Sequence, residues 1–135
     1  MNIPRILNLR VAGTAARSNR KNTYIGRPAG DHDTHFGNPF SHIKGKAAVQ
    51  VKDRPTALKY FDQWLDGTAH QDVEPTRRLW ILANLHLIRE SDAVLCWCAP
   101  AKCHGESLVA RAFPELPQIV SAAILVEQLD FFATR

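Results

Sequence analysis

The sequence lacks the features that mark secreted, membrane-spanning or fibrous proteins. It has only three cysteines in 135 residues, and these lie close together at Cys96, Cys98 and Cys103. An odd number of neighbouring cysteines is not the disulfide framework of a small secreted protein. The most apolar late run, residues 119–126, is much shorter than the roughly 20 residues that cross a bilayer, and the first residues lack the apolar stretch of a secretory signal. We therefore expect a soluble cytoplasmic protein with no membrane contact.

Acidic residues are scarce in the first part of the chain. Residues 1–54 hold ten Lys or Arg and three Asp or Glu, which gives +7, whereas residues 55–135 hold seven and ten, which gives −3. A basic half that is mostly loop favours an anionic partner, either a phosphorylated small molecule or nucleic acid. A solvated surface with an accidental charge gradient explains the net charge of +4 equally well.

The apolar pattern predicts a small α/β protein. Short runs rich in apolar and β-branched residues predict strands at 5–11 and 23–25, and a continuous apolar run predicts a strand covered on both faces at 93–98. Residues 12–22 and 31–46 are polar or irregular, and we expect loops there. Apolar residues at helical spacing, with Pro and Gly at the ends, predict helices at 54–66, 75–89, 104–113 and 118–133. A strand over residues 118–126 is the alternative for the last of them.

These elements fit a single domain over residues 1–135. A domain of this length buries roughly two thirds of the surface of its unfolded chain, so it folds without disulfides. Strands that alternate with helices favour βαβ layering. We expect a Rossmann-like sandwich with a short sheet and about four helices.

Candidate catalytic residues follow the strand predicted at 93–98. Cys103 and His104 stand after a short loop, Gly105 opens the next helix, and Glu106 lies in its first turn. A helix start at the carboxyl end of a strand attracts anions and favours the thiolate form of cysteine. Cys103 or His104 is therefore a candidate nucleophile or acid–base group, with Glu106 as a candidate catalytic carboxylate. The more common role of such a glutamate is to complement the helix dipole.

The same segment contains metal ligands. Cys96, Cys98, Cys103 and His104 provide three thiols and one imidazole, the donor set of a structural zinc site. Cys96 and Cys98 are two residues apart on a predicted strand, so both thiols point to one face. Their spacing departs from the usual Cys-x(2–4)-Cys pair of zinc fingers, and buried structural thiols are the plainer alternative. Zinc is thus an alternative hypothesis for the otherwise unknown cofactor.

A second group of candidates precedes the first predicted helix. Gly26, Arg27 and Pro28 follow the strand at 23–25, and Gly37 and Asn38 begin a Gly-Asn-Pro-Phe sequence. Glycine lets a ligand approach the backbone, arginine offers a planar fork for phosphate or carboxylate, and an asparagine amide both donates and accepts. Two tight turns with a surface arginine are the plainer alternative.

The motifs together resemble a known family. In order, they are Tyr-Ile-Gly-Arg-Pro, Gly-Asn-Pro-Phe, Leu-Cys-Trp-Cys and Cys-His-Gly, at 24–28, 37–40, 95–98 and 103–105. This set is similar to domain-of-unknown-function family 4326, which is widespread in phages and bacteria. The resemblance covers about residues 5–113 and leaves the predicted helix at 118–133 as an accessory element.

The resemblance implies properties that the residues alone do not. It implies that one site holds Arg27, Asn38, Cys98, Cys103 and His104. It also makes a phage or prophage origin, and hence the host cytoplasm, our expectation. Kinship with Rossmann-like nucleotide-processing domains follows only by analogy of fold.

Three hypotheses for function result. The first is an enzyme or sensor that binds or processes a nucleotide, nucleoside or other phosphorylated small molecule, in a site formed by the Gly-Arg-Pro and Gly-Asn-Pro-Phe loops and the cysteine–histidine segment. It requires that segments far apart in the sequence meet. The second is a zinc-stabilised module that binds nucleic acid. The third is a phage protein that binds a host protein without catalysis.

Overall fold

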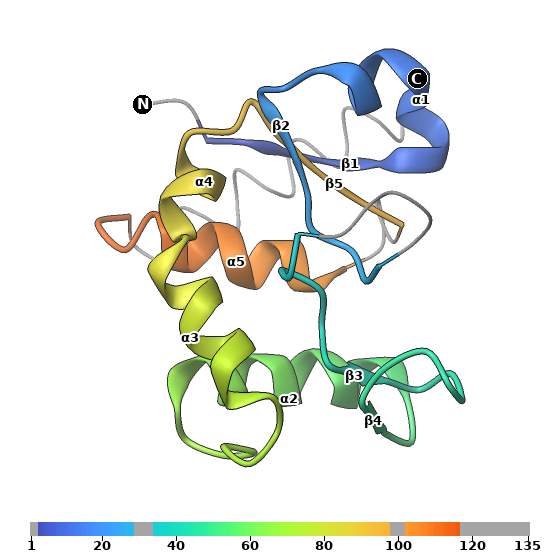
Figure 1. Cartoon of the computed structure of the whole chain (residues 1–135), viewed down its shortest axis with the longest axis vertical. Coiled ribbons are helices and arrows are strands. Elements are labelled where there is room, and N and C mark those ends of the chain that lie inside the picture. The colour runs from blue at the N-terminus through green and yellow to red at the C-terminus, as the bar shows by residue number, and fades with distance from the viewer. Residues whose placement is uncertain (1–2, 29–33, 98–101, 117–135) are drawn as a thin grey trace. The chain divides into compact units, whose positions relative to one another are not determined.

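The computed structural model describes residues 3–28, 34–97 and 102–116 (Figure 1). The chain forms two compact units, which we call the sheet unit (residues 1–25 and 85–135) and the inserted unit (residues 26–84). Helices and parallel strands both occur, so the predicted α/β class is confirmed. Cys98 and the helix predicted at 118–133 lie outside the described residues. No helix of the described part is both long and apolar enough to span a membrane.

A three-stranded parallel sheet forms the centre of the sheet unit. Its strands are β1 (Arg5–Asn8), β2 (Asn22–Tyr24) and β5 (Ala93–Cys96), in the order β1-β5-β2. β5 pairs in parallel with a neighbour on each side, and all of its residues are buried. The continuous apolar run therefore predicted the burial of this strand correctly.

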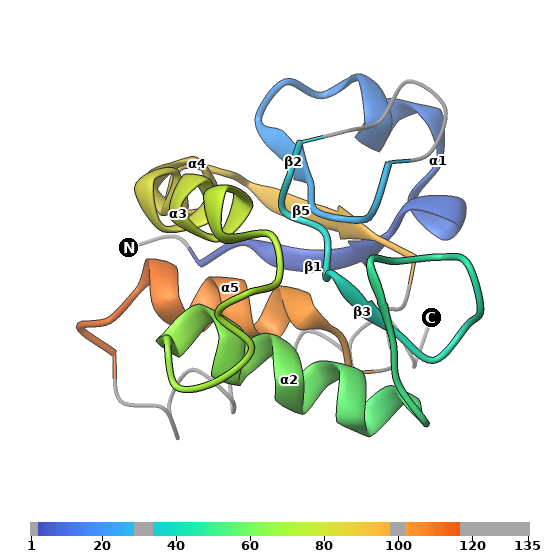
Figure 2. The ribbon, with the colours of Figure 1, turned by 60° about the horizontal axis from the view of Figure 1, so that its bottom comes forward.

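Helices cover both faces of this sheet (Figure 2). Helix α1 (Leu9–Ser18) packs Leu9 and Ala16 against a cluster that includes Leu95. On the other face, α5 (His104–Ala112) comes so close that a Cβ atom on Gly105 would lie 3.6 Å from Ile6 Cδ1. Ile6 is paired with Val94, the residue before Leu95, and successive strand residues point to opposite faces of the sheet. Helices α1 and α5, which pack against Leu95 and Ile6, therefore lie on opposite sides. The short helix α4 (Leu85–Arg89) packs beside α5.

The start of α1 overturns two predictions. The strand predicted at 5–11 ends at Asn8, and the loop predicted at 12–22 is wrong because α1 occupies most of it. Asn8 ends the strand by capping the helix, since its Oδ1 accepts a hydrogen bond of 2.9 Å from the backbone N–H of Arg10. Gly13, at a φ of 81°, then interrupts the helix. The helix therefore consists of short pieces, whose periodicity is too brief to detect in the sequence.

The inserted unit contains a longer helix that the sequence predicted correctly. α2 (Arg54–Asp66) begins where Asp53 Oδ1 accepts from the backbone N–H of Thr56 at 2.9 Å, and it ends at Gly67 in the left-handed conformation. Its apolar face is buried and includes Phe61 and Trp64. A short parallel pair, β3 (Phe40–Ser41) and β4 (Val49–Gln50), packs beside it through β3.

The helix predicted at 75–89 is two helices. α3 (Pro75–Ala83) ends at Asn84, and α4 begins with the next residue. The Asn84 side chain donates to the carbonyl oxygen of Trp80 at 2.8 Å, and its backbone leaves the helical conformation. Asparagine competes in this way for backbone groups, so an apolar period that continues across it does not guarantee a continuous helix. The described residues thus contain five helices, whereas three of the predicted helices fall within them.

Candidate functional site

The carboxyl ends of β1 and β5 lie side by side at one edge of the sheet, where Asn8 is paired with Cys96. Beyond this edge the chain leaves β1 for α1 on one face of the sheet, and it leaves β5 for α5 on the other. Open parallel sheets bind ligands where neighbouring connections diverge in this way. We call this place the edge site, and its described residues are Asn8, Arg10, Tyr24 and Trp97.

Trp97 is the prominent side chain of the edge site. It is 39% exposed, whereas Trp64 is fully buried. Its indole N–H donates to the hydroxyl of Tyr24 at 2.9 Å, and its backbone oxygen accepts from Asn8 Nδ2 at 3.1 Å. The guanidinium carbon of Arg10 lies 6.0 Å from the centre of the ring. The edge site therefore presents an anchored aromatic ring beside a cation.

Cys103 and Glu106 form a capping box at the start of α5. Cys103 Sγ accepts from the backbone N–H of Gly105 at 3.3 Å, and a carboxylate oxygen of Glu106 accepts from the backbone N–H of Cys103 at 3.2 Å. Cysteine here takes the place that serine or threonine usually has. The N–H groups of Cys103 and Gly105 thus already have hydrogen-bond partners within the chain, although the sequence predicted that this helix start attracts an anion. The catalytic roles predicted for both side chains stay predictions.

His104 connects α5 to the end of β2. Its ring Nε2 lies 2.6 Å from the carbonyl oxygen of Ile25 in a buried contact, and because a carbonyl only accepts, Nε2 is the donor. Gly105 allows α5 to lie this close to Ile25, since a Cβ atom at Gly105 would lie 2.7 Å from Ile25 Cδ1. These contacts give both residues a packing role, and their predicted roles toward a ligand stay predictions.

Cys96 and Cys103 bring two thiols together inside the sheet unit. Their Sγ atoms are 3.7 Å apart in a buried contact. Zn–S bonds of about 2.3 Å in a tetrahedron place two sulfurs about 3.8 Å apart, so this pair fits two corners of a zinc site. Within residues 3–28, 34–97 and 102–116, no group of three or more His, Cys, Asp or Glu side chains is placed to hold a metal. The zinc hypothesis, which also needs Cys98, stays a prediction.

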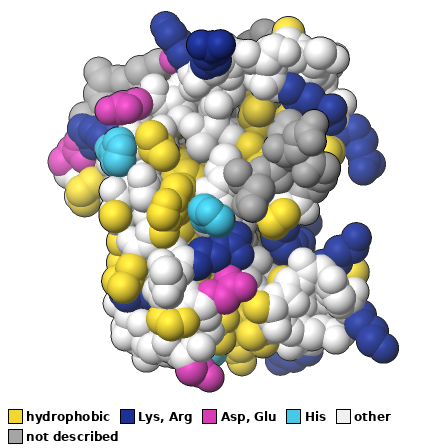
Figure 3. All heavy atoms as spheres, in the orientation of Figure 1, with side chains coloured by type: hydrophobic (Ala, Val, Ile, Leu, Met, Phe, Trp, Pro, Cys, Tyr) yellow, Lys and Arg dark blue, Asp and Glu magenta, His cyan; other side chains and the backbone are white. Residues whose placement is uncertain are grey.

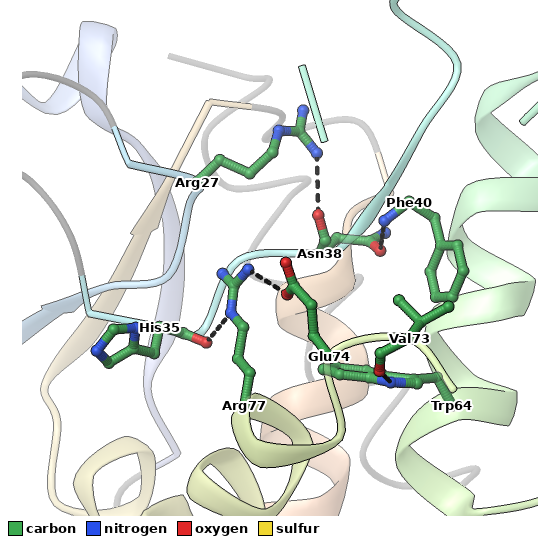
Figure 4. Close-up of polar contacts among 8 residues, drawn as sticks. All are labelled: Arg27, His35, Asn38, Phe40, Trp64, Val73, Glu74 and Arg77. Atoms are coloured by element: carbon green, nitrogen blue, oxygen red, sulfur yellow. Dashed lines mark hydrogen bonds and ion pairs between the residues drawn. The ribbon is translucent and has the colours of Figure 1, made fainter. Parts of the chain in front are cut away.

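The second group of predicted residues meets in the inserted unit, and Figure 4 shows Arg27 and Asn38 from it. A Cβ atom on Gly37 would lie 2.9 Å from each of three atoms, which are the carbonyl oxygen of Gly26, the Cα of Arg27 and a guanidinium nitrogen of Arg77. Two of these atoms belong to the backbone and have little freedom to move. The two glycine turns therefore touch at Gly37, and only glycine fits there. Pro28, the last member of the first turn, is exposed.

Asn38 binds the chain itself. Its Nδ2 donates to the carbonyl oxygen of Ala57 at 3.1 Å, and its Oδ1 accepts from the backbone N–H of Phe40 at 2.9 Å. Arg27 donates to the backbone oxygen of Asn38 over a longer 3.5 Å. The amide of Asn38 thus fastens the Gly-Asn-Pro-Phe turn to α2. Its predicted contact with a ligand stays a prediction, as does that of Arg27.

Arg77 is a residue of this region that the sequence analysis missed. From α3 its Nε donates to the carbonyl oxygen of His35 at 2.9 Å, and its Nη1 pairs with the carboxylate of Glu74 at 3.0 Å (Figure 4). Its Nη2 is buried and makes no hydrogen bond to any described residue. Arg77 and Arg27 therefore place two guanidinium groups at the Gly-Asn-Pro-Phe turn. In the sequence, Arg77 is only one of two adjacent arginines in a helix, with no motif around it.

A comparison with protein families decides the identity of the chain. The profile of the family described as Domain of unknown function (DUF4326) matches residues 9–113. The chain belongs to this family. The resemblance seen in the sequence is therefore confirmed, while the phage or prophage origin stays a prediction. No curated protein and no solved structure matches the chain.

Basic residues are concentrated at the N-terminal end of the segment that the DUF4326 profile matches, and just before it. Residues 3–25 carry five exposed Lys or Arg and no Asp or Glu, namely Arg5, Arg10, Arg17, Arg20 and Lys21. Lys and Arg side chains are visible on the side of the molecule where α1 lies (Figure 3). Since α1 begins at the edge site, Arg10 brings part of this charge there.

One acidic group of the DUF4326 chain has a large pKa shift. Hydrogen bonds from Arg89 lower the pKa of Glu115 from 4.5 to about 2. Arg89 also donates to the carbonyl oxygen of Ala112 at 3.0 Å, so this pair joins α4 to the end of α5. It lies at the opposite end of α5 from Cys103, and we assign it to stability instead of ligand binding.

Proposed function

We propose that this DUF4326 protein binds a nucleotide, or a similar phosphorylated small molecule with a planar ring, at the edge site. The observation that carries the proposal is the divergence of α1 and α5 to opposite faces of the sheet beyond the adjacent strands β1 and β5. At such a divergence the loops separate and leave room for a ligand.

Trp97 and Arg10 support the planar ring in this proposal. Stacked bases are separated by roughly 3.4 Å, so a base between the indole and the guanidinium requires about 7 Å. The observed separation is 6.0 Å, and Arg10 is an exposed side chain that has freedom to move. A base inserted there exchanges one cation–π contact for two stacking contacts. Base–aromatic stacking contributes about 1–3 kcal/mol, enough to favour nucleotides over simple phosphates.

Arg10 is a better candidate for binding the phosphate than the N-terminus of α5. The capping box already engages the N–H groups of Cys103 and Gly105, and Glu106 adds a negative charge beside them. Arg10 has no such competitor among its described contacts, and it stands in a segment without acidic residues. We therefore assign the phosphate to the N–H edge of the Arg10 guanidinium, whose donors lie in the plane of the group while its face stacks on the base.

The proposal is that the protein binds the ligand, and a reaction on the bound ligand is a separate prediction. The groups predicted for catalysis are Cys103, His104 and Glu106, and each has a structural contact that a catalytic role would have to share. A protein that recognises a nucleotide without transforming it is consistent with these contacts. Processing of the ligand stays a prediction for these three residues.

Titration of the full chain with nucleoside monophosphates tests the proposal. We expect saturable binding by calorimetry, with a change in tryptophan fluorescence that is lost in Trp97→Leu. Arg10→Gln weakens binding by about tenfold, as for the loss of one charge-assisted hydrogen bond. Arg17→Gln is the matched control, because Arg17 is an exposed arginine of the same helix outside the edge site. Equal binding by all three variants and the unchanged protein would contradict the proposal, and so would the absence of saturable binding.

Comparison of ligands separates the base from the phosphate. A nucleoside monophosphate should bind about tenfold more tightly than ribose 5-phosphate, because only the former stacks on Trp97. In Trp97→Leu the difference between the two ligands should shrink, because only the contact of the base with Arg10 remains. If ribose 5-phosphate binds as tightly as the nucleotide to the unchanged protein, the site recognises phosphate alone.

A further inference from the structure

Cys96 and Cys103 are a buried pair of thiols that neither the proposed binding nor the family description uses. Cys96 ends β5, and Cys103 is the N-cap of α5. Their Sγ atoms are 3.7 Å apart, and the residues are only 1% and 2% exposed. They are seven positions apart in the sequence, so their contact results from the placement of α5 against the sheet.

We propose that Cys96 and Cys103 form an intramolecular disulfide when the protein is oxidised, which makes them a site of reversible modification. A disulfide has an S–S length of about 2.05 Å, so the two sulfurs must approach by about 1.7 Å from their present 3.7 Å. Side-chain torsions move a sulfur over such a distance. The bond would connect the central strand of the sheet to the helix that covers one of its faces.

Hydrogen peroxide provides a balanced reaction for this step. One cysteine loses its proton, and its sulfur attacks a peroxide oxygen, which gives a sulfenic acid and one water. The deprotonated sulfur of the second cysteine then attacks the sulfenic sulfur. The S–S bond forms, the S–O bond breaks, and the leaving hydroxide takes up a proton as a second water. Two thiols are oxidised and one peroxide is reduced.

Burial determines the rate of this reaction and the lifetime of its product. With both thiols covered, peroxide reaches them only when the protein opens locally. The same cover then shields the disulfide from reducing thiols. The hydrogen bond from the Cys103 N–H to Glu106 holds the start of α5 in place. We therefore expect this capping contact to control how often the thiols become accessible.

Peptide mapping of the full chain tests the proposal without reference to any ligand. The protein is treated with hydrogen peroxide, its remaining thiols are alkylated with N-ethylmaleimide, and it is digested without reducing agent. Mass spectrometry should find Cys96 and Cys103 in one cross-linked species, which is lighter than the two reduced peptides by two hydrogen atoms. Dithiothreitol should restore both thiols.

Three variants sharpen this experiment. Cys98→Ser should leave the cross-link intact, whereas Cys96→Ser should abolish it. Cys103→Ser should also abolish it while keeping a side-chain acceptor at the helix start. Glu106→Ala should speed formation of the bond by about threefold to tenfold, because loss of a cap favours local opening. If a cysteine variant fails to fold, mapping of the unchanged protein and of Cys98→Ser still decides the question.

Two results would overturn the proposal. The first is a pattern in which Cys98 takes part in the cross-link, or in which all three thiols are still alkylated after prolonged oxidation. The second is a native mass that contains one zinc ion, lost on denaturation, with thiols that resist peroxide while the metal is bound. That second result would instead support coordination of zinc by these cysteines. Neither result bears on nucleotide binding at Trp97, which is measured separately.

Discussion

The two compact units use their distinctive residues in different ways. In the sheet unit, Trp97 and Arg10 stay partly exposed at the edge of the sheet. In the inserted unit, Gly37 and Asn38 are buried, and Asn38 bonds to the backbone of its own unit. A motif that looks suited to a ligand can therefore serve to hold a loop in place. Exposure and hydrogen-bond partners distinguish the two uses, and residue type does not.

The largest expected effect is that of Gly37→Ala in the inserted unit. The added Cβ would lie 2.9 Å from backbone atoms of Gly26 and Arg27, so the two turns must separate. We expect the free energy of unfolding to fall by about 2–3 kcal/mol, as for an overpacked core site. Urea denaturation measures the loss.

Gly45→Ala is the control for this substitution. Gly45 has a φ of 75° and no neighbour within 4 Å of a Cβ position, so alanine there costs only the strain of the left-handed backbone. That strain is about 1 kcal/mol. If both variants lose the same stability, the close contact at Gly37 is not what requires glycine.

Asn38→Ala should have the next largest effect. It removes the hydrogen bonds of the Asn38 amide to the carbonyl oxygen of Ala57 and to the N–H of Phe40 in a buried region. The free energy of unfolding should fall by about 1–3 kcal/mol, as measured by urea denaturation. In the comparison between the units, this variant is informative because it tests a motif residue for stability alone.

Trp97→Leu should show the reverse behaviour in the sheet unit. Because Trp97 is 39% exposed, its loss should reduce stability by less than about 1 kcal/mol. Binding of a nucleoside monophosphate should weaken by about tenfold. Calorimetry and urea denaturation on the same sample separate the two effects. A large loss of stability with unchanged binding would place Trp97 among the structural residues, like Asn38.

The smallest effect should come from Glu115→Gln, which removes the ion pair with Arg89. The pKa of Glu115 is lowered from 4.5 to about 2, so the folded state favours the ionised carboxylate. Its stabilisation is complete above about pH 4.5 and is lost as the pH falls toward 2. Thermal unfolding should show the variant slightly less stable at pH 7 and equal to the unchanged protein near pH 2.

Solvent exposure makes this effect small and sensitive to salt. Both side chains of the pair are about 40% exposed, so solvent and ions screen their attraction. The difference between the variant and the unchanged protein should therefore shrink further in 1 M NaCl. A difference that does not shrink between pH 7 and pH 2 would show that Glu115 acts through packing, because most of the stabilisation by its charge is lost over this range.

Local signals in the sequence were sufficient for several elements and for the family. α2 carries its own start and end in Asp53 and Gly67, and β5 shows its burial as an apolar run. The same local signals failed for α1, because Gly13 divides this helix into pieces too short to show a period. They also failed at Asn84, which ends α3 although the apolar period continues past it. Such interruptions depend on single side chains that bond to nearby backbone groups, and a hydrophobic pattern does not record them.

The sequence by itself determined the α/β class, the capped helix α2, the burial of the strand β5 and the choice of Cys103, Asn38 and Gly37 as unusual positions. Only the tertiary structure decided what those positions do. The contact of Cys96 with Cys103, the fit of Gly37 against Gly26, and the hydrogen bond of Trp97 to Tyr24 each join residues that periodicity does not connect. Helix caps and apolar periods act over a few residues, whereas these contacts arise when strands and helices pack across the chain.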